Sequence, residues 1–117
     1  MNERTFVMFC IISVLFSGTL DTLTTLLCAR VPNIYETNPV VRKWIEEHNT
    51  TAFIFKCLVP VPFFVSFYIL WKCCEKYKAV CKAMTLCQRF IEIYVIVYAV
   101  FFIFVVVNNL VLFLLYS

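Results

Sequence analysis

The sequence predicts an all-α membrane protein: a bundle of three transmembrane helices, with a short outer interfacial helix and a basic, amphipathic cytoplasmic connector. Of the 117 residues, 63% are hydrophobic, and the mean hydropathy is +0.91, whereas soluble domains are about 45–50% apolar. The apolar residues form three long runs instead of the short alternating segments of a membrane barrel. We expect residues 1–117 to form a single domain.

The three runs cover residues 5–29, 52–71 and 90–116. Each is long enough to cross a hydrocarbon core, which takes roughly 20 helical residues. A cleavable signal peptide is the alternative for the first run. That run, however, stays apolar well beyond the roughly 7–15 residues of an ordinary signal-peptide core, which favours a membrane helix.

The distribution of Lys and Arg predicts the orientation, because cytoplasmic loops carry an excess of these residues. An N-terminus inside and a C-terminus outside puts six positive residues in the cytoplasm: Arg4, Lys72, Lys76, Lys78, Lys82 and Arg89. The same arrangement leaves three outside: Arg30, Arg42 and Lys43. We therefore expect a multi-pass protein of the cell membrane in this orientation.

Both connecting segments have helical features. Asn38 and Pro39 are favoured residues at the N-cap and the first position of a helix. The residues up to His48 are amphipathic and include Trp44, a residue suited to the membrane interface. The segment 72–89 has an apolar stripe among its lysines, so it is either a solvated connector or a surface for anionic lipid headgroups.

Polar residues inside the first run lie on one helical face. Ser17, Asp21, Thr24, Thr25 and Cys28 have the spacing i, i+4, i+7, i+8 and i+11. An Asp near the bilayer centre costs roughly 2.5–3.5 kcal/mol, so this face is expected to contact protein or water and not acyl chains.

Depth along the helices suggests the partners of Asp21. A rise of about 1.5 Å per residue places both Asp21 and Lys56 in the outer half of the bilayer, which predicts an ion pair between them. Asn108 and Asn109 lie at a similar depth in the third run, roughly 12 Å from its outer end. Glu36 and Asn38, in the segment just outside, could descend onto the same place. The sequence thus predicts a polar site made of Asp21, Thr24, Thr25, Glu36, Asn38, Lys56, Asn108 and Asn109.

The pattern Asp21-x-x-Thr24-Thr25, Glu36-x-Asn38-Pro39 and an intramembrane Lys56 resembles a group of small integral membrane proteins of archaea and bacteria that share a domain of unknown function. The resemblance covers the first half of the chain, and the Asn pair of the third run extends it. It implies a membrane protein and no particular activity. The segment 72–89 lies outside the shared pattern.

Three classes of function follow from these residues. The site could bind or conduct an ion, a proton or a small polar group, within a homo-oligomer or together with other membrane subunits. It could be an intramembrane enzyme in which Asp21 or Glu36 is the general base and Lys56 stabilises negative charge. It could equally be a structural subunit, because Ser, Thr and Asn often join membrane helices by hydrogen bonds. The sequence predicts neither a cofactor nor a metal, and no nucleic-acid partner; the enzyme is the less favoured class because no known nucleophile–base pair is present.

Overall fold

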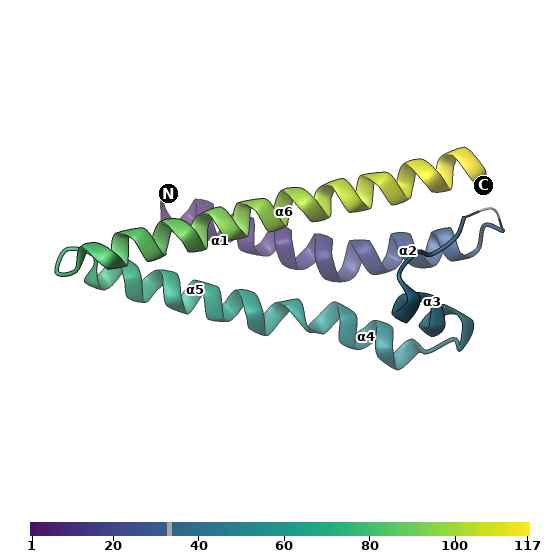
Figure 1. The fold of residues 1–117 in the computed structure, drawn as a ribbon, viewed down its shortest axis with the longest axis horizontal. Coiled ribbons are helices and arrows are strands. Elements are labelled where there is room, and N and C mark those ends of the chain that lie inside the picture. The colour runs from purple at the N-terminus through teal and green to yellow at the C-terminus, as the bar shows by residue number, and fades with distance from the viewer. Residues whose placement is uncertain (33) are drawn as a thin grey trace.

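The computed structural model describes residues 1–32 and 34–117, and these residues are helical wherever they are regular. Three rods lie side by side (Figure 1), over extents of 58 × 28 × 21 Å. The first rod is α1 (Glu3–Val14), the π-helix η1 (Leu15–Leu20) and α2 (Asp21–Ala29). The second is α4 (Thr50–Leu58) and α5 (Pro60–Tyr77), and the third is α6 (Lys82–Tyr116). The short helix α3 (Pro39–Glu46) lies between the first and second rods in sequence.

Each rod has the length and composition of a helix that crosses a bilayer. Mean hydropathy reaches 1.9 in Glu3–Ala29, 2.0 in Thr50–Tyr77 and 2.8 in Lys82–Tyr116. Large apolar side chains remain exposed on the outward faces, among them Ile11, Phe63 and Phe104. Water would penalise such faces and acyl chains would not. The all-helical fold with three membrane-spanning candidates is therefore as predicted.

The segment 72–89 is not a separate element, in contrast to the predicted amphipathic connector. α5 continues to Tyr77, α6 begins at Lys82, and residues 78–81 form the turn between them. Neither Gly nor Pro interrupts the chain after Pro62, so nothing ends these helices where the apolar runs end. A hydrogen bond of 2.6 Å from Gln88 Nε2 to Glu75 Oε2 joins the two helices beyond the apolar runs.

The apolar core lies toward the end of the bundle that holds the N-terminus and the α5–α6 turn. Phe6, Cys10, Phe64, Trp71 and Val95 form it, so all three rods contribute. The rings of Phe6 and Trp71 stack with centroids 5.1 Å apart. Trp71 is 2% exposed, and its indole N–H donates to Glu92 Oε1 over 3.0 Å. This core fixes the relative positions of the rods and leaves the opposite half for the polar residues.

The second rod is divided one turn after Lys56. α4 ends at Leu58, and Pro60 is the first residue of α5. Proline has no N–H and its ring clashes with the preceding turn, so a helix bends or breaks where it stands. The division separates α4, which carries Lys56, from the apolar core packed against α5.

The helix predicted after Asn38 is α3. Asn38 is its N-cap and accepts hydrogen bonds from the backbone N–H groups of Val40 and Val41, over 3.0 and 3.4 Å. Pro39 is the first helical residue, where its missing N–H costs nothing. The Trp44 ring meets Phe53 of α4 edge-on at a centroid distance of 5.8 Å, so α3 is anchored on the second rod.

Candidate functional site

The polar face of the first rod is turned into the bundle, as its spacing predicts. Six polar residues of this rod are buried, together with Cys28 at the end of the stripe: Ser13, Ser17, Asp21, Thr22, Thr24 and Thr25. The leucines of the opposite face, such as Leu15 and Leu23, are about half exposed. The first rod therefore supplies the polar wall against which the other two rods pack.

One member of this face, Thr22, does not belong to the predicted stripe. At 3.6 residues per turn, Thr22 falls away from the line through Ser17 and Asp21. The structure has η1 immediately before it, and the wider i→i+5 turns of a π-helix rotate the residues that follow. Thr22 is 4% exposed as a result. A π-helix has no simple sequence signature, so residue spacing alone could not reveal this.

The first and second rods touch most closely at Gly18, the only glycine of the chain. A Cβ atom placed there would stand 2.8 Å from the backbone oxygen of Cys57. Glycine allows this approach because it has no side chain. The Cys57 thiol also donates to the Gly18 carbonyl oxygen over 3.7 Å. The close contact holds α4 where the neighbouring Lys56 reaches the first rod.

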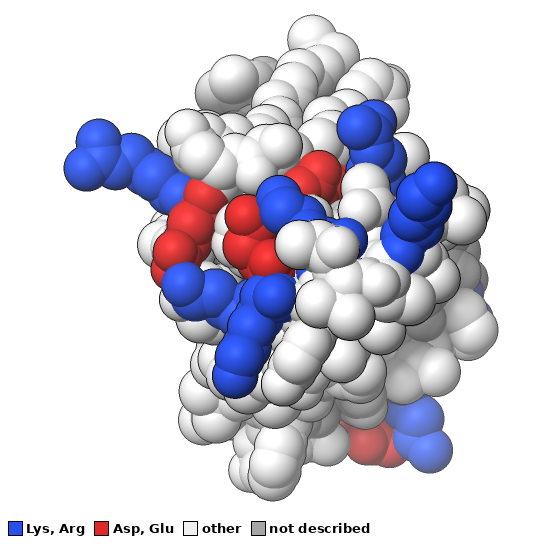
Figure 2. Space-filling view, turned by 90° about the vertical axis from the view of Figure 1, so that its left-hand side faces the viewer, with Lys and Arg blue, Asp and Glu red and all other residues white. Residues whose placement is uncertain are grey.

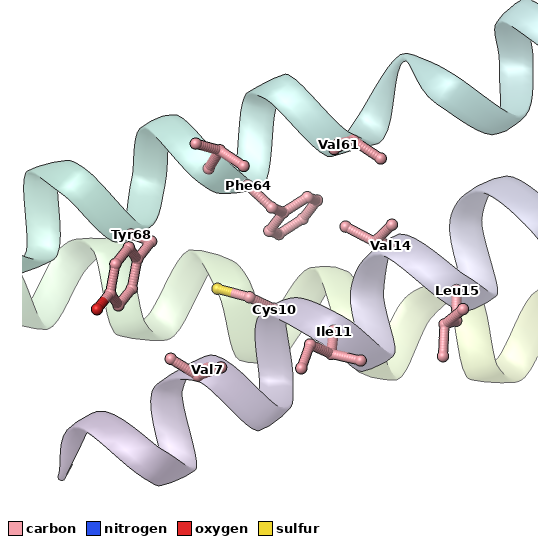
Figure 3. Close-up of a pocket in the computed structure, with 9 residues that line it drawn as sticks. Val7, Cys10, Ile11, Val14, Leu15, Val61, Phe64 and Tyr68 are labelled. Atoms are coloured by element: carbon pink, nitrogen blue, oxygen red, sulfur yellow. The ribbon is translucent and has the colours of Figure 1, made fainter.

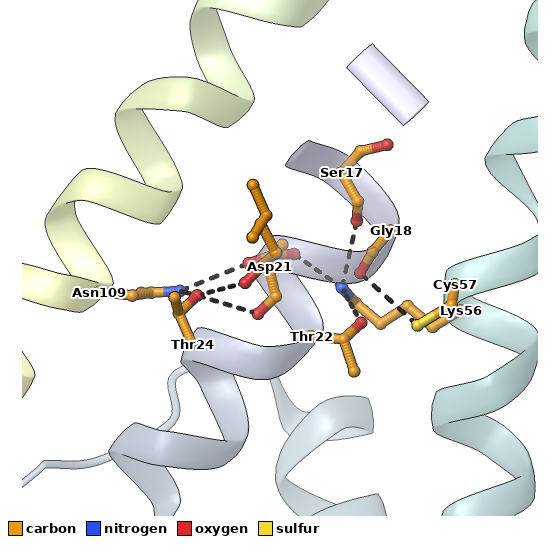
Figure 4. A network of polar contacts seen from close by, with 9 residues as sticks. Ser17, Gly18, Asp21, Thr22, Thr24, Lys56, Cys57 and Asn109 are labelled. Carbon is orange, nitrogen blue, oxygen red and sulfur yellow. Dashed lines mark hydrogen bonds and ion pairs between the residues drawn. The ribbon is translucent and has the colours of Figure 1, made fainter. Parts of the chain in front are cut away.

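Asp21 and Lys56 meet beside this contact. Lys56 Nζ lies 2.7 Å from Asp21 Oδ2 and 3.3 Å from Thr22 Oγ1, and it also donates to the Ser17 carbonyl oxygen over 3.5 Å. Figure 4 shows the ammonium group surrounded by these acceptors. The Lys56 side chain is 21% exposed and the Asp21 side chain is 13% exposed, so both are largely shielded from the surroundings.

The third rod reaches Asp21 from the other side through Asn109. The Asn109 amide donates to Asp21 Oδ1 over 3.4 Å and to Thr24 Oγ1 over 3.1 Å. In Figure 4, Asp21 lies between Asn109 and Lys56. Thr24 in turn donates to the carbonyl oxygen of Leu20 over 2.8 Å. One carboxylate thus joins all three rods, and each of its oxygens has a donor.

A cavity of about 720 Å³ borders this polar centre. Its polar wall contains Ser17, Asp21, Asn38 and Lys56, and its apolar wall is rich in aromatic rings: Trp44, Phe55, Tyr98 and Phe102. The Ser17 hydroxyl is buried and has no hydrogen-bond partner within the described part of the chain. A buried hydroxyl without a partner costs free energy. Its oxygen is enclosed by protein, so Ser17 borders the cavity through its other atoms.

The predicted site is divided between two cavities. A second cavity, of about 200 Å³, is lined by Thr25, Glu36, Asn108 and Asn109. Neither Asp21 nor Lys56 lines it. Within the second cavity Glu36 Oε1 accepts a hydrogen bond from the backbone N–H of Asn38 over 3.0 Å. Glu36 and Asn108 therefore line a cavity other than the one that Asp21 and Lys56 line. Asn38 does line the first cavity, although its side chain is engaged in capping α3.

A third cavity, of about 390 Å³, is apolar and lies away from this chemistry. Its walls come from α1, η1 and α5, and include Val7, Cys10, Phe64 and Tyr68 (Figure 3). Within the residues that the structure describes, no three His, Cys, Asp or Glu side chains are grouped so that they could hold a metal ion. The candidate functional site is therefore the cavity that Asp21 and Lys56 line.

Comparisons with protein-family models, with curated proteins and with solved structures find no match to this chain. What the protein does is therefore inferred from the geometry of its polar centre.

Proposed function

We propose that the chain is a three-span protein of the cell membrane with its N-terminus in the cytoplasm. The support is the asymmetry of its ends. Figure 2 shows Lys and Arg side chains gathered around a few acidic ones at the end that holds the N-terminus and the α5–α6 turn. Glu3 pairs there with Lys72 over 2.8 Å, and Glu75 with Lys78 over 2.9 Å. Even so, Lys and Arg outnumber the acids at this end, as they do in cytoplasmic segments.

In this orientation α3 lies at the outer surface, with Trp44 at the level of the lipid headgroups. The basic end, residues 72–89, faces the cytoplasmic leaflet and attracts its anionic headgroups, each nearby Lys or Arg contributing about 1 kcal/mol. Asp21 and Lys56 then form their pair inside the outer half of the bilayer. A charge pair in that place is satisfied by protein, as intramembrane charges usually are.

The proposed activity is the binding of a small polar group at the Asp21–Lys56 centre, from the cavity beside it. The observation that carries this is the cavity of about 720 Å³ that both Asp21 and Lys56 line. A pair that served packing alone would need no adjoining space of this size. Three helices are few for a complete pathway, so we place the chain in a homo-oligomer or with other membrane subunits.

A structural role for the pair is the competing explanation, because every donor and acceptor of Asp21 and Lys56 finds a partner within the chain. The enzyme class is less favoured, because Glu36 lines a different cavity from Lys56, and Asp21, the other candidate base, already accepts hydrogen bonds from Lys56 and Asn109. A general base and its partner must lie within hydrogen-bond reach of one reacting group.

Thermal unfolding in phosphatidylglycerol nanodiscs separates binding from structure. The probes are tetramethylammonium chloride and sodium phosphate, with sodium chloride at equal ionic strength as the reference. A probe that binds only the folded state raises Tm, by an amount that grows with its concentration. We expect at least one probe to raise Tm of the wild type but not of the Asp21→Asn/Lys56→Met double variant. Lys43→Met, which removes a lysine whose side chain is 71% exposed, is the matched control and should respond like the wild type. A wild type that responds to neither probe would leave the pair with a structural role only.

A further inference from the structure

The second cavity, which lies between α2, α6 and the segment 34–37, has an uncompensated negative charge. Glu36 is half-buried in its wall, and neither Lys nor Arg lines it. Arg42 stacks on the Tyr35 ring at 4.9 Å and stays outside the lining. Within the described part of the chain, Glu36 forms no ion pair. A carboxylate that is removed from water requires a compensating charge, so the cavity suits a cation.

Neutral side chains add further oxygen acceptors to this cavity. Thr25 is 8% exposed, and no hydrogen bond engages its hydroxyl among the residues that the structure describes. Its oxygen, unlike that of Ser17, is not fully enclosed by protein, so an occupant of the cavity has access to it. Asn109 directs its amide nitrogen toward the polar centre of Figure 4, which leaves its oxygen as an acceptor. Asn108 lines the cavity beside it.

A primary ammonium group matches this set of oxygens. It has one positive charge and three N–H donors, and the cavity offers one carboxylate and several neutral acceptors. The volume of about 200 Å³ exceeds what a bare ion needs, since a water molecule takes up about 30 Å³ in the liquid. The remaining wall is apolar and includes Ile34, Ile45 and Leu112, which suits a short alkyl chain.

We propose that the second cavity binds the ammonium group of a small primary amine. Glu36 compensates its charge, the N–H groups donate to Glu36, Thr25 and the two asparagines, and the alkyl chain lies against the apolar wall. This site goes beyond the one proposed at Asp21 and Lys56, neither of which lines the second cavity. The same ammonium chemistry occurs in free amines and in ethanolamine lipid headgroups, and the test separates these two sources.

The test is thermal unfolding of the full chain in phosphatidylglycerol nanodiscs. The probe is n-butylammonium chloride, with sodium chloride at equal ionic strength as the reference. Tetramethylammonium is the matched control cation, because it is an isomer of n-butylammonium with the same charge and has no N–H group. The concentration dependence of Tm gives an apparent Kd for each cation. We expect n-butylammonium to bind at least tenfold more tightly, in line with hydrogen bonds to a charged group.

Three variants locate the binding. Glu36→Gln keeps the size of the side chain and removes its charge, so it should weaken n-butylammonium at least tenfold. Thr25→Val replaces the hydroxyl with a methyl group and should weaken it several-fold. Glu46→Gln is the matched control, because Glu46 is an exposed acid of α3 outside the cavity lining, and the Kd should stay within about twofold. The Tm of each variant without amine shows whether it remains folded.

Two results would overturn the amine site: equal binding of the two isomers, and n-butylammonium binding that is indifferent to Glu36→Gln. The Asp21→Asn/Lys56→Met double variant should keep the response to n-butylammonium. A response lost in that variant and kept in Glu36→Gln would move the amine to the Asp21–Lys56 cavity, so the proposed function would stand and this inference would fail.

The lipid composition of the nanodiscs identifies the source of the ammonium group. Equal shares of phosphatidylethanolamine or phosphatidylcholine are added to the phosphatidylglycerol, and the titration with n-butylammonium is repeated. The same Kd in both mixtures supports a free amine as the ligand. A Kd about tenfold weaker with phosphatidylethanolamine supports its headgroup as the occupant, because the headgroup then competes with the probe.

Discussion

Gly18 and Cys57 hold the first two rods in backbone contact, since a Cβ on Gly18 would stand 2.8 Å from the Cys57 carbonyl oxygen. That atom belongs to a helix backbone and cannot move aside as a flexible side chain could. We therefore expect Gly18→Ala to force the rods apart, at a cost of about 1–3 kcal/mol of stability. The opposing effect is the higher helix propensity of alanine, worth about 1 kcal/mol. Denaturation in detergent measures the net change.

Thr19→Ala is the control for this substitution, because Thr19 is the next residue along the rod and is exposed. It should change stability by less than about 0.5 kcal/mol, as surface substitutions usually do. A Gly18→Ala variant more stable than the wild type would show that the contact tolerates a methyl group.

The Asp21–Lys56 pair is expected to behave as a unit. Asp21→Asn or Lys56→Met alone leaves one shielded charge without its partner, which typically costs about 3–5 kcal/mol. The double variant should recover much of that loss, because neither charge is then orphaned. Thermal unfolding of the wild type, the two single variants and the double variant completes a double-mutant cycle. Strictly additive losses would mean that the 2.7 Å contact contributes no coupling.

The two neighbouring asparagines of α6 should differ sharply. Asn109 donates to Asp21 and Thr24, whereas Asn108 is exposed and borders the second cavity. Asn109→Ala removes donors from buried acceptors and should cost about 1–3 kcal/mol. Asn108→Ala should cost less than about 0.5 kcal/mol. Similar losses in both variants would contradict the placement of Asn109 at the junction of the rods.

Thiol labelling tests the orientation. Three cysteines are exposed, Cys73, Cys81 and Cys87, and all lie at the end of the bundle that we place in the cytoplasm. A membrane-impermeant maleimide added to intact cells should leave them unlabelled. Glu47→Cys, at an exposed position of the opposite end, is the positive control and should be labelled. Labelling of the wild-type chain without permeabilisation would reverse the proposed topology.

Residue spacing predicted much of the site because a helix repeats regularly. The stripe from Ser17 to Cys28 is buried as its periodicity required, and Asp21 does meet Lys56. Depth fixes a residue's height in the bundle but not its angle around it, so it could not show that Glu36 and Asn108 line a different cavity from Asp21 and Lys56. Thr22 was missed because the π-helix η1, which precedes it, changes the direction in which the following residues point. Apolar runs likewise mark what lipid can cover, and they do not mark where α5 and α6 end.

The hydrogen bond between Glu75 and Gln88 has a practical consequence, because it joins α5 and α6 past the end of their apolar runs. From Trp71 to Tyr77, α5 adds about 9 Å at 1.5 Å per residue. With the proposed topology, this pair of helix ends forms a rigid stalk on the cytoplasmic side. A soluble four-helix protein spliced into residues 78–81 through two unbroken helices would be held in fixed orientation. It would give a chain of 13.8 kDa enough ordered mass for particle alignment in electron cryomicroscopy.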